Sequence, residues 1–178
     1  MKKEVQVFEY ANDILKELRT GVLLTTKADG KVNSMTISWG ALGIEWNTPI
    51  FVTFVRTGRY TRELLDKNPE FTVNIPLGEF DKNILSFCGN KSGRTNDKIK
   101  ELSLTMMDSD LVSVPAIKEL PLTLECKVLY AQAQDETAIP SYIKEKNYPQ
   151  DVDSSHPSAN RDYHIAYYGE ILKAYIVS

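Results

Sequence analysis

The amino-acid sequence predicts a mainly β fold of the α+β class, in which a closed or partly closed β-barrel is surrounded by peripheral helices. Residues in β-type runs clearly outnumber those in helical patterns. The runs also lack the regular strand–helix–strand alternation of a doubly wound nucleotide-binding sheet. Several of the runs are long and apolar, and closing them into a barrel removes the exposed edges that they would otherwise present.

The first part of the chain predicts a helix, a hairpin and a central strand. Residues 11–19 carry apolar side chains at the spacing of an amphipathic helix, and Gly21 is placed to end it. The runs Val22–Lys27 and Lys31–Trp39 are joined by an Asp-Gly pair, which takes positive φ at low cost and therefore predicts a hairpin. Ile50–Arg56 follows as a strand apolar enough to lie inside the sheet.

The remaining elements are predicted from periodicity and breakers. Further strands are expected at Glu70–Pro76, Leu122–Tyr130 and Tyr163–Val177, and helices at Tyr60–Asn68, Phe80–Phe87, Asn96–Leu102 and Ile139–Lys146. Loops are expected at Gly89–Thr95 and Asn147–Asp162. Asp81 is the expected N-cap of its helix, and Gly169 is expected to form a bulge in the last strand.

Composition and charge describe an ordinary globular chain. Of 178 residues, 42% are apolar and 25% are charged, and the formal net charge is −3. These values exclude a disordered, collagen-like or disulfide-framework protein. A slightly acidic chain has no general attraction for nucleic acid or anionic membranes. We expect a single domain over residues 1–178, since no linker-like segment or internal repeat interrupts the pattern.

The sequence predicts a cytoplasmic protein. Cys88 and Cys126 are too few for a disulfide framework and have no CxxC spacing. No signal-peptide core follows the N-terminus, and no stretch has the roughly 18 apolar residues needed to span a bilayer.

The common catalytic and phosphate-binding motifs are absent from the sequence. It contains no GxGxxG, GxxxxGK[ST], GxSxG or HExxH pattern. The two histidines, His156 and His164, are eight residues apart, and no metal site is expected from them. Cys88 is interpreted as a small buried hydrophobic residue rather than a nucleophile.

A first candidate segment is Asn33–Gly40. It combines small hydrogen-bonding side chains with a Trp and a Gly, where a simple strand would alternate. Such a segment could line a planar polar heterocycle with Trp39 as one wall. The alternative is an edge strand with a solvated Ser/Thr face, and composition alone favours this alternative.

Two further segments could contact an anion or cover a ligand. Arg56–Arg62 runs from the end of a strand into a helix, where free N–H groups, hydroxyls and guanidinium groups suit a phosphate. The alternative is three exposed arginines on a surface turn. Cys88–Thr95 contains two glycines among polar side chains and could form a lid, although most such loops only connect elements.

Read together, these segments resemble the flavin reductase-like family of FMN-binding split barrels, particularly its flavoredoxin-like branch. The resemblance extends from about Gly21 to Val177, and its matching stretches are Asn33–Trp39, Arg56–Thr61 leading to Phe71–Pro76, Cys88–Lys98 and His164–Ile171. It implies a Greek-key split β-barrel and a homodimer with one FMN per subunit near the dimer interface.

The resemblance also implies roles for individual residues. The isoalloxazine and ribityl groups would contact the first segment, through Asn33, Ser34, Met35, Thr36, Ser38 and Trp39. The phosphate end would be held by Arg56, Arg59, Tyr60 and Thr61. Lys91 and Ser92 would close over the site, and His164 would act at the flavin face where the electron donor or acceptor stacks. Thr57-Gly58 stands where family members often have Ser or His.

Three hypotheses remain open at the level of sequence. The first is an FMN-dependent oxidoreductase that passes electrons from NADH or NADPH to free flavin, a ferric chelate or a protein acceptor. The second is a flavoredoxin-like FMN electron carrier, reduced by a small redox protein and without its own nicotinamide site. The third is a split barrel that has lost its flavin.

Overall fold

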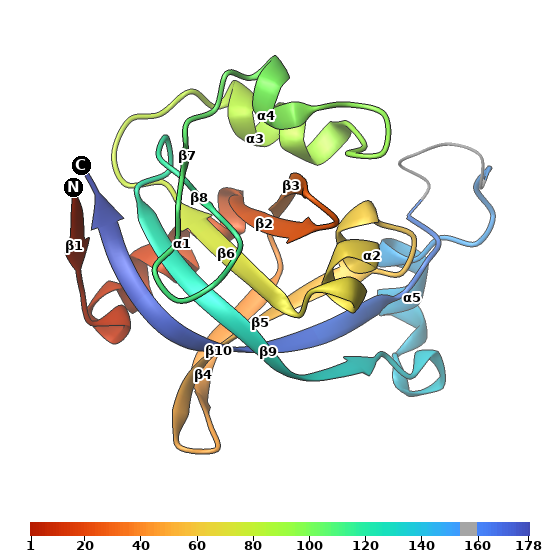
Figure 1. Cartoon of the computed structure of the whole chain (residues 1–178). Helices are drawn as coiled ribbons and strands as arrows, with labels where there is room; N and C mark the ends of the chain where they lie inside the picture. The colour runs from red at the N-terminus through yellow and green to blue at the C-terminus, as the bar shows by residue number, and fades with distance from the viewer. Residues whose placement is uncertain (154–159) are drawn as a thin grey trace.

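The computed structural model describes residues 1–153 and 160–178. Within these residues an eight-stranded antiparallel sheet curls into a barrel, with strands in the order β3-β2-β6-β9-β10-β5-β4 and β1 paired to β10 (Figure 1). The strands are β1 Lys2–Glu4, β2 Val22–Ala28, β3 Lys31–Ile37, β4 Gly40–Glu45, β5 Thr48–Arg56, β6 Glu70–Ile75, β9 Leu122–Ala133 and β10 His164–Val177, and a separate short pair is formed by β7 Met106–Met107 and β8 Ala116–Ile117. The predicted barrel with peripheral helices is confirmed.

The two long strands β9 and β10 bend around the barrel together (Figure 1). The first half of β10 also pairs with β5, and its last three residues pair with β1. The register between β9 and β10 shifts at Gly169, which confirms the predicted bulge. A Cβ atom at Gly169 would lie 2.4 Å from Phe71 Cζ, so the core leaves no room for a side chain there.

The helices lie outside the sheet (Figure 1). They are α1 Ala11–Thr20, α2 Tyr60–Lys67, α3 Asn83–Asn90, α4 Lys98–Glu101 and α5 Ser141–Asn147, with 3-10 turns η1 Val7–Tyr10 and η2 Glu136–Ala138. The predicted helix Phe80–Phe87 was wrong at both ends. Asp81 is not its N-cap: its carboxylate accepts a bond from the Asn83 N–H (2.9 Å) in a turn before the helix. At the other end, the helix continues through Gly89 and Asn90.

Two tight hairpins depend on residues with positive φ. The predicted β2–β3 turn uses Asp29 (φ 50°) and Gly30 (φ 72°). The β4–β5 hairpin was not predicted, and it turns at Trp46 (φ 51°) and Asn47 (φ 59°). This second hairpin projects from the barrel (Figure 1). Strand β4 escaped detection because two of its six residues are glycines and its side chains are half-buried or exposed.

The barrel interior is apolar, but both faces of the central strands are covered. Leu122, Leu124 and Cys126 of β9 lie in the main core, as their alternation predicts. The polar residues between them are buried as well: Glu125 accepts bonds from the Asp110 and Leu111 N–H groups at 2.8 and 2.7 Å. The loop before β9 therefore satisfies a carboxylate that alternation alone would place in water.

A second apolar cluster fixes α3 and α4 above the barrel. Ile84 and Cys88 of α3 and Ile99 of α4 pack with Leu23 of β2. This packing places the loop between α3 and α4 over strand β3, beside the candidate site. Among the described residues, no helix is long and apolar enough to cross a membrane.

Candidate functional site

Two cavities adjoin along strand β3 and the start of α2. The first, called the Trp39 cavity, has a volume of about 240 Å³ and is lined by Met35, Thr36, Ile37, Ser38, Trp39, Phe54, Arg56, Arg59 and His164. The second, called the loop cavity, has a volume of about 250 Å³ and is bounded by β3, the start of α2, α4 and the segment 88–94. Met35, Thr36 and Arg59 line both cavities, so together they form one groove, the β3 groove.

The β3 groove brings together twelve of the thirteen residues predicted for the site. Those in the Trp39 cavity are Met35, Thr36, Ser38, Trp39, Arg56, Arg59 and His164. Those added by the loop cavity are Asn33, Tyr60, Thr61, Lys91 and Ser92. Ser34 lines neither cavity, because its hydroxyl is buried 2.5 Å from Thr25 Oγ1 on β2.

Asn33 presents an acceptor without a partner beside the loop cavity. Its Nδ2 donates to Thr61 Oγ1 at the start of α2 (2.9 Å), and this bond fixes the orientation of the amide. Its Oδ1 is buried and has no hydrogen-bond partner among the described residues. Gly93 approaches so closely that a Cβ atom there would lie 2.0 Å from this oxygen. An orphaned buried acceptor is costly, and it marks a place where a ligand donor would be stabilised.

Lys98 places a buried positive charge at the same cavity. The side chain is 4% exposed, and its Nζ donates to the carbonyl oxygens of Ser34 (2.9 Å) and Cys88 (2.8 Å). No carboxylate of the described residues forms an ion pair with it. Burial lowers the pKa of Lys98, while the Cys88 sulfur opposes the shift. Sequence reasoning gave Lys98 no role, although its position one turn before Leu102 on a predicted helix was a sign that it faces inward.

The turn from β5 into α2 is held by the segment that leads into β10. Arg56 Nη1 donates to the carbonyl oxygens of Asn160 (3.0 Å) and Asp162 (2.6 Å), and Nη2 donates to that of Asn147 (2.9 Å). Burial lowers the pKa of Arg56. The Gly58 N–H donates to the Asp162 carboxylate at 2.7 Å. A carboxylate of the chain itself therefore occupies part of the turn that the sequence predicts as an anion site.

His164 opens strand β10 at the wall of the Trp39 cavity. Its ring centroid lies 5.0 Å from that of Trp39, and its Nδ1 is 2.8 Å from the Tyr148 hydroxyl. Burial lowers the pKa of His164 to about 4, with a further contribution from Arg56, so the ring is neutral at pH 7. Sequence reasoning missed Tyr148, which lies at the end of α5 inside a segment predicted as loop.

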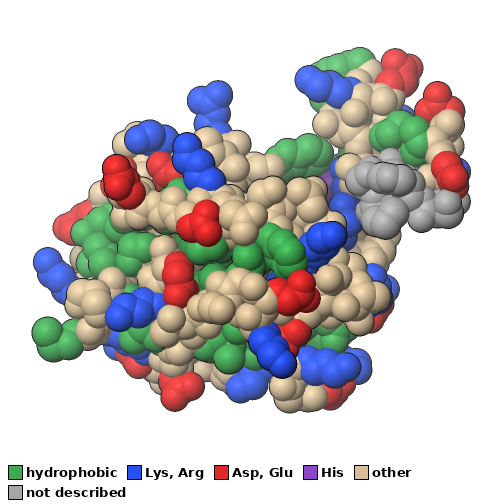
Figure 2. Space-filling view, turned by 90° about the horizontal axis from the view of Figure 1, so that it is seen from above, with side chains coloured by type: hydrophobic (Ala, Val, Ile, Leu, Met, Phe, Trp, Pro, Cys, Tyr) green, Lys and Arg blue, Asp and Glu red, His purple; other side chains and the backbone are tan. Residues whose placement is uncertain are grey.

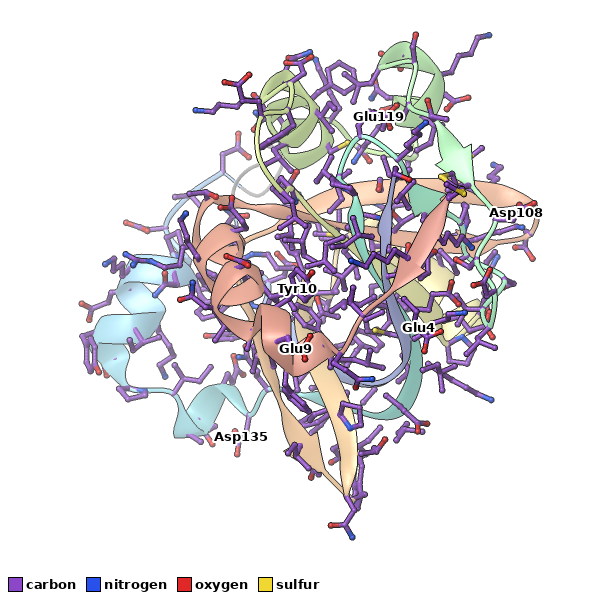
Figure 3. The ribbon with its side chains drawn as sticks, turned by 90° about the vertical axis from the view of Figure 1, so that its left-hand side faces the viewer. Glu4, Glu9, Tyr10, Asp108, Glu119 and Asp135 are labelled. Atoms are coloured by element: carbon purple, nitrogen blue, oxygen red, sulfur yellow. The ribbon has the colours of Figure 1, made fainter. Side chains whose placement is uncertain are left out.

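The other titratable candidates give a simpler result. Cys88 and Cys126 are buried, as predicted, and burial raises the pKa of the Cys88 thiol to about 11. No group of three His, Cys, Asp or Glu side chains in residues 1–153 and 160–178 could hold a metal ion. The acidic residues labelled in Figure 3 come from separate elements and do not converge. His156, from which no metal site is expected, lies outside the described residues.

A comparison with known protein families decides the family of this chain. The model of the flavin reductase like domain matches residues 16–177. The chain belongs to the flavin reductase-like family. Its fold is the Greek-key split barrel that the sequence resemblance implied.

Three proteins illustrate what this chain is similar to. An uncharacterized protein of Archaeoglobus fulgidus is 33% identical over 130 residues, covering 72% of this chain and 69% of its own. Flavoredoxin of Methanosarcina acetivorans is 26% identical with a TM-score of 0.63, over 89% of this chain and 68% of its own. An FMN-binding domain of a flavin reductase-like enzyme from Shewanella baltica shares the fold, with a TM-score of 0.65 and 14% identity over 99% of this chain and 77% of its own.

The residues of the β3 groove fit a flavin nucleotide. Trp39, Phe54 and Met35 offer apolar and aromatic surface to a planar ring. Asn33 Oδ1 is a buried acceptor without a partner among the described residues, and the buried Lys98 ammonium has no carboxylate partner among them. On the face seen in Figure 2 basic and acidic side chains are interspersed. The charged side chains that line the two cavities are all basic: Arg56, Arg59, Lys91, Arg94 and Lys98.

Proposed function

We propose that this chain binds FMN along the β3 groove and passes electrons from NADH or NADPH to free flavin, a ferric chelate or a protein acceptor. The observation that carries the proposal is a buried acceptor without a partner, Asn33 Oδ1, together with a buried ammonium that has no carboxylate partner among the described residues, that of Lys98, beside an aromatic cavity. FMN supplies the redox chemistry, and the protein supplies binding, orientation and electrostatics.

The chain's residues divide the work along the groove. Trp39 and Phe54 exclude water from the ring at one end. Lys98 offers positive charge in a site of low dielectric constant, where it acts more strongly than in water. Arg59 and the first turn of α2 face the phosphate, since a helix N-terminus favours an anion. His164 and Ser38 face the reacting partner in the Trp39 cavity.

The first test is the visible spectrum of the purified protein after incubation with FMN and gel filtration. Retained flavin absorption supports a flavoprotein, because the polypeptide does not absorb there. Anaerobic bleaching by NADH or NADPH supports the oxidoreductase. A colourless protein at micromolar concentration after incubation with excess FMN would contradict the proposal.

A second candidate function is favoured by the similarity to a flavoredoxin. In this alternative the chain is an FMN electron carrier without its own nicotinamide site. Bound FMN would then be reduced by ferredoxin or rubredoxin and would stay oxidised with NADH and NADPH. The same anaerobic titration therefore separates the two functions.

Arg59 provides a test of the proposed phosphate end. We expect Arg59→Ala to weaken the binding of FMN by about 1.5–3 kcal/mol, the scale of a hydrogen bond to a charged group. Riboflavin, which lacks the phosphate, should lose much less. Fluorescence titration of both ligands measures the difference, and an equal loss for both would remove Arg59 from the phosphate site.

We also propose a cytoplasmic homodimer. The two free, buried cysteines suit a reducing compartment. Ile44 and Trp46, which are 69% and 57% exposed on the β4–β5 hairpin, offer apolar surface to a second copy. Light scattering of the purified protein tests the dimer, and a monomer at all concentrations with and without FMN would exclude it.

A further inference from the structure

A chain of three hydrogen-bonding side chains leads from strand β9 to the wall of the Trp39 cavity. Gln134 follows β9 directly, Tyr148 follows α5 directly, and His164 begins β10. The Tyr148 hydroxyl donates to Gln134 Oε1 at 3.0 Å and lies 2.8 Å from His164 Nδ1. Tyr148 is 3% exposed and stacks on Tyr163 with ring centroids 4.6 Å apart, so its hydroxyl is held in place.

The orientation of the Gln134 amide is determined by a second bond. The backbone N–H of His164 donates to Gln134 Oε1 at 3.2 Å. Reversing the amide would place its NH₂ group against this N–H, which sets two donors against each other. Oε1 therefore faces both His164 and Tyr148.

The position of the protons follows from this orientation. An amide oxygen only accepts, so the single hydroxyl proton of Tyr148 is given to Gln134. The hydroxyl oxygen then faces His164 Nδ1 with a lone pair. Only a protonated Nδ1 completes the 2.8 Å bond. The neutral ring therefore carries its proton on Nδ1, and Nε2 is left with a lone pair.

Nε2 of His164 has no hydrogen-bond partner among the described residues. The side chain is 5% exposed and lines the Trp39 cavity. The charged groups around the ring are Arg56 on β5, Arg59 before α2 and Asp162 before β10. Burial and then Arg56 oppose protonation of the ring, Asp162 favours it, and Arg59 makes a smaller contribution against it. The uncharged Tyr148 completes the surroundings.

We propose that Gln134 and Tyr148 are positioning residues that hold His164 as the Nδ1–H tautomer, so that Nε2 is a hydrogen-bond acceptor of the Trp39 cavity. The acceptor selects a bound group that presents an N–H or O–H at this point, and it disfavours a carbonyl or carboxylate there. The part that concerns the bound group rests on the proposed function, whereas the tautomer is a property of the ligand-free chain.

The tautomer is measured by long-range ¹H–¹⁵N NMR of ¹⁵N-histidine-labelled, ligand-free protein. The chain has two histidines, so His156→Gln leaves one signal set. We expect Nδ1 to be protonated in this protein and the proton to move to Nε2 on adding Tyr148→Phe. The matched control is Tyr163→Phe, which removes a hydroxyl from the same stack without touching His164, and it should leave the tautomer unchanged. An Nε2–H ring in the His156→Gln protein, or an unchanged ring in Tyr148→Phe, would overturn the assignment.

A second variant keeps the test valid where Tyr148→Phe fails to fold. Gln134→Glu retains both acceptor bonds, so the tautomer should persist while the new negative charge raises the pKa of His164. An unchanged pKa would contradict the coupling. FMN and then NADH are added under anaerobic conditions. The Nε2 resonance should shift on addition of the ligand that donates a hydrogen bond to Nε2. No movement with either ligand bound would remove the ligand part, and failure of FMN to bind would remove the proposed function while leaving the tautomer result intact.

Discussion

Single residues of the β3 groove show how far chemistry can be read from a side chain's type alone. Asn33 and Ser34 are neighbours with similar hydrogen-bonding capacity, yet their positions differ. Asn33 Oδ1 is a buried acceptor without a partner beside the loop cavity, while the Ser34 hydroxyl is hydrogen-bonded to that of Thr25. The sequence predicted both for the site. Strand alternation separates them, because adjacent residues point to opposite faces.

Gly93 should be sensitive to the smallest added side chain. A Cβ atom there would meet Asn33 Oδ1 at 2.0 Å, and Asn33 is held by Thr61. We expect Gly93→Ala to push the loop outward and to weaken FMN binding about tenfold, or about 1.4 kcal/mol. Gly43→Ala is the control, because no atom lies within 4 Å of its added Cβ. Fluorescence titration measures the affinity of both variants for FMN. Equal affinities of Gly93→Ala and Gly43→Ala would contradict the close approach of Gly93 to Asn33 Oδ1.

The depressed pKa of His164 predicts a loss of stability in acid. The unfolded chain binds the proton near pH 6.5 and the folded chain near pH 4, so the unfolded state binds more protons between these values. The contribution is therefore complete above pH 6.5 and is lost as the pH falls toward 4, by about 3 kcal/mol in total.

Urea unfolding at several pH values, in the His156→Gln background, measures this dependence. Adding His164→Asn removes the titrating imidazole. Between pH 6.5 and pH 4 the free energy of unfolding of this variant should fall by up to about 3 kcal/mol less than that of the His156→Gln protein. A curve of unchanged slope would show that the folded and unfolded chains titrate His164 alike.

At the scale of elements, the segment that leads into β10 covers the turn between β5 and α2. Asp162 accepts the Gly58 N–H, and the Asn160 side chain accepts from Arg59 Nη2 at 2.9 Å. A carboxylate at this turn repels the phosphate that the proposed function places beside α2. Asp162→Asn removes that charge, so we expect the preference for FMN over riboflavin to increase several-fold.

The ratio of the two dissociation constants at low and high salt tests this expectation. The gain should shrink at high ionic strength, because exposed charges are screened. Asp151→Asn, which removes the same charge from an exposed position in the neighbouring stretch of chain, is the control. A ratio that falls in Asp162→Asn would mean that the carboxylate supports the turn more than it repels the ligand.

The same segment shows what sequence patterns leave out. Periodicity predicted α1, the β2–β3 hairpin, α2 and the bulge at Gly169, because local apolar spacing and Gly positions determine them. It missed Tyr148 and Gln134, whose roles come from pairing between elements far apart in the chain. It also missed Lys98, because its helical spacing from Leu102 was a weak sign of burial, and the two backbone carbonyls that it binds come from β3 and α3, far apart in the chain.

At the scale of the whole molecule, the groove joins parts of the barrel to the helices that cover it. Strand β3 and the start of β10 come from the barrel, α2 covers one side, and the α3–α4 unit covers another. The order of the segments in the chain was enough to predict the family. The shape of the groove could not be predicted from that order, because it depends on the packing of α3 and α4 against Leu23.

Ligand binding should therefore stabilise the fold as a unit. A ligand that binds only the folded chain raises the free energy of unfolding by RT ln(1 + [L]/Kd), which is about 2.7 kcal/mol at 100 times Kd. We expect FMN at this excess to raise the thermal midpoint in a single transition, because the groove is assembled from the barrel and its covering helices together. Calorimetry with FMN, with riboflavin and with inorganic phosphate measures the contribution of each part. FMN should give the largest shift, and a shift with phosphate alone equal to that with FMN would mean that the ring does not occupy the Trp39 cavity.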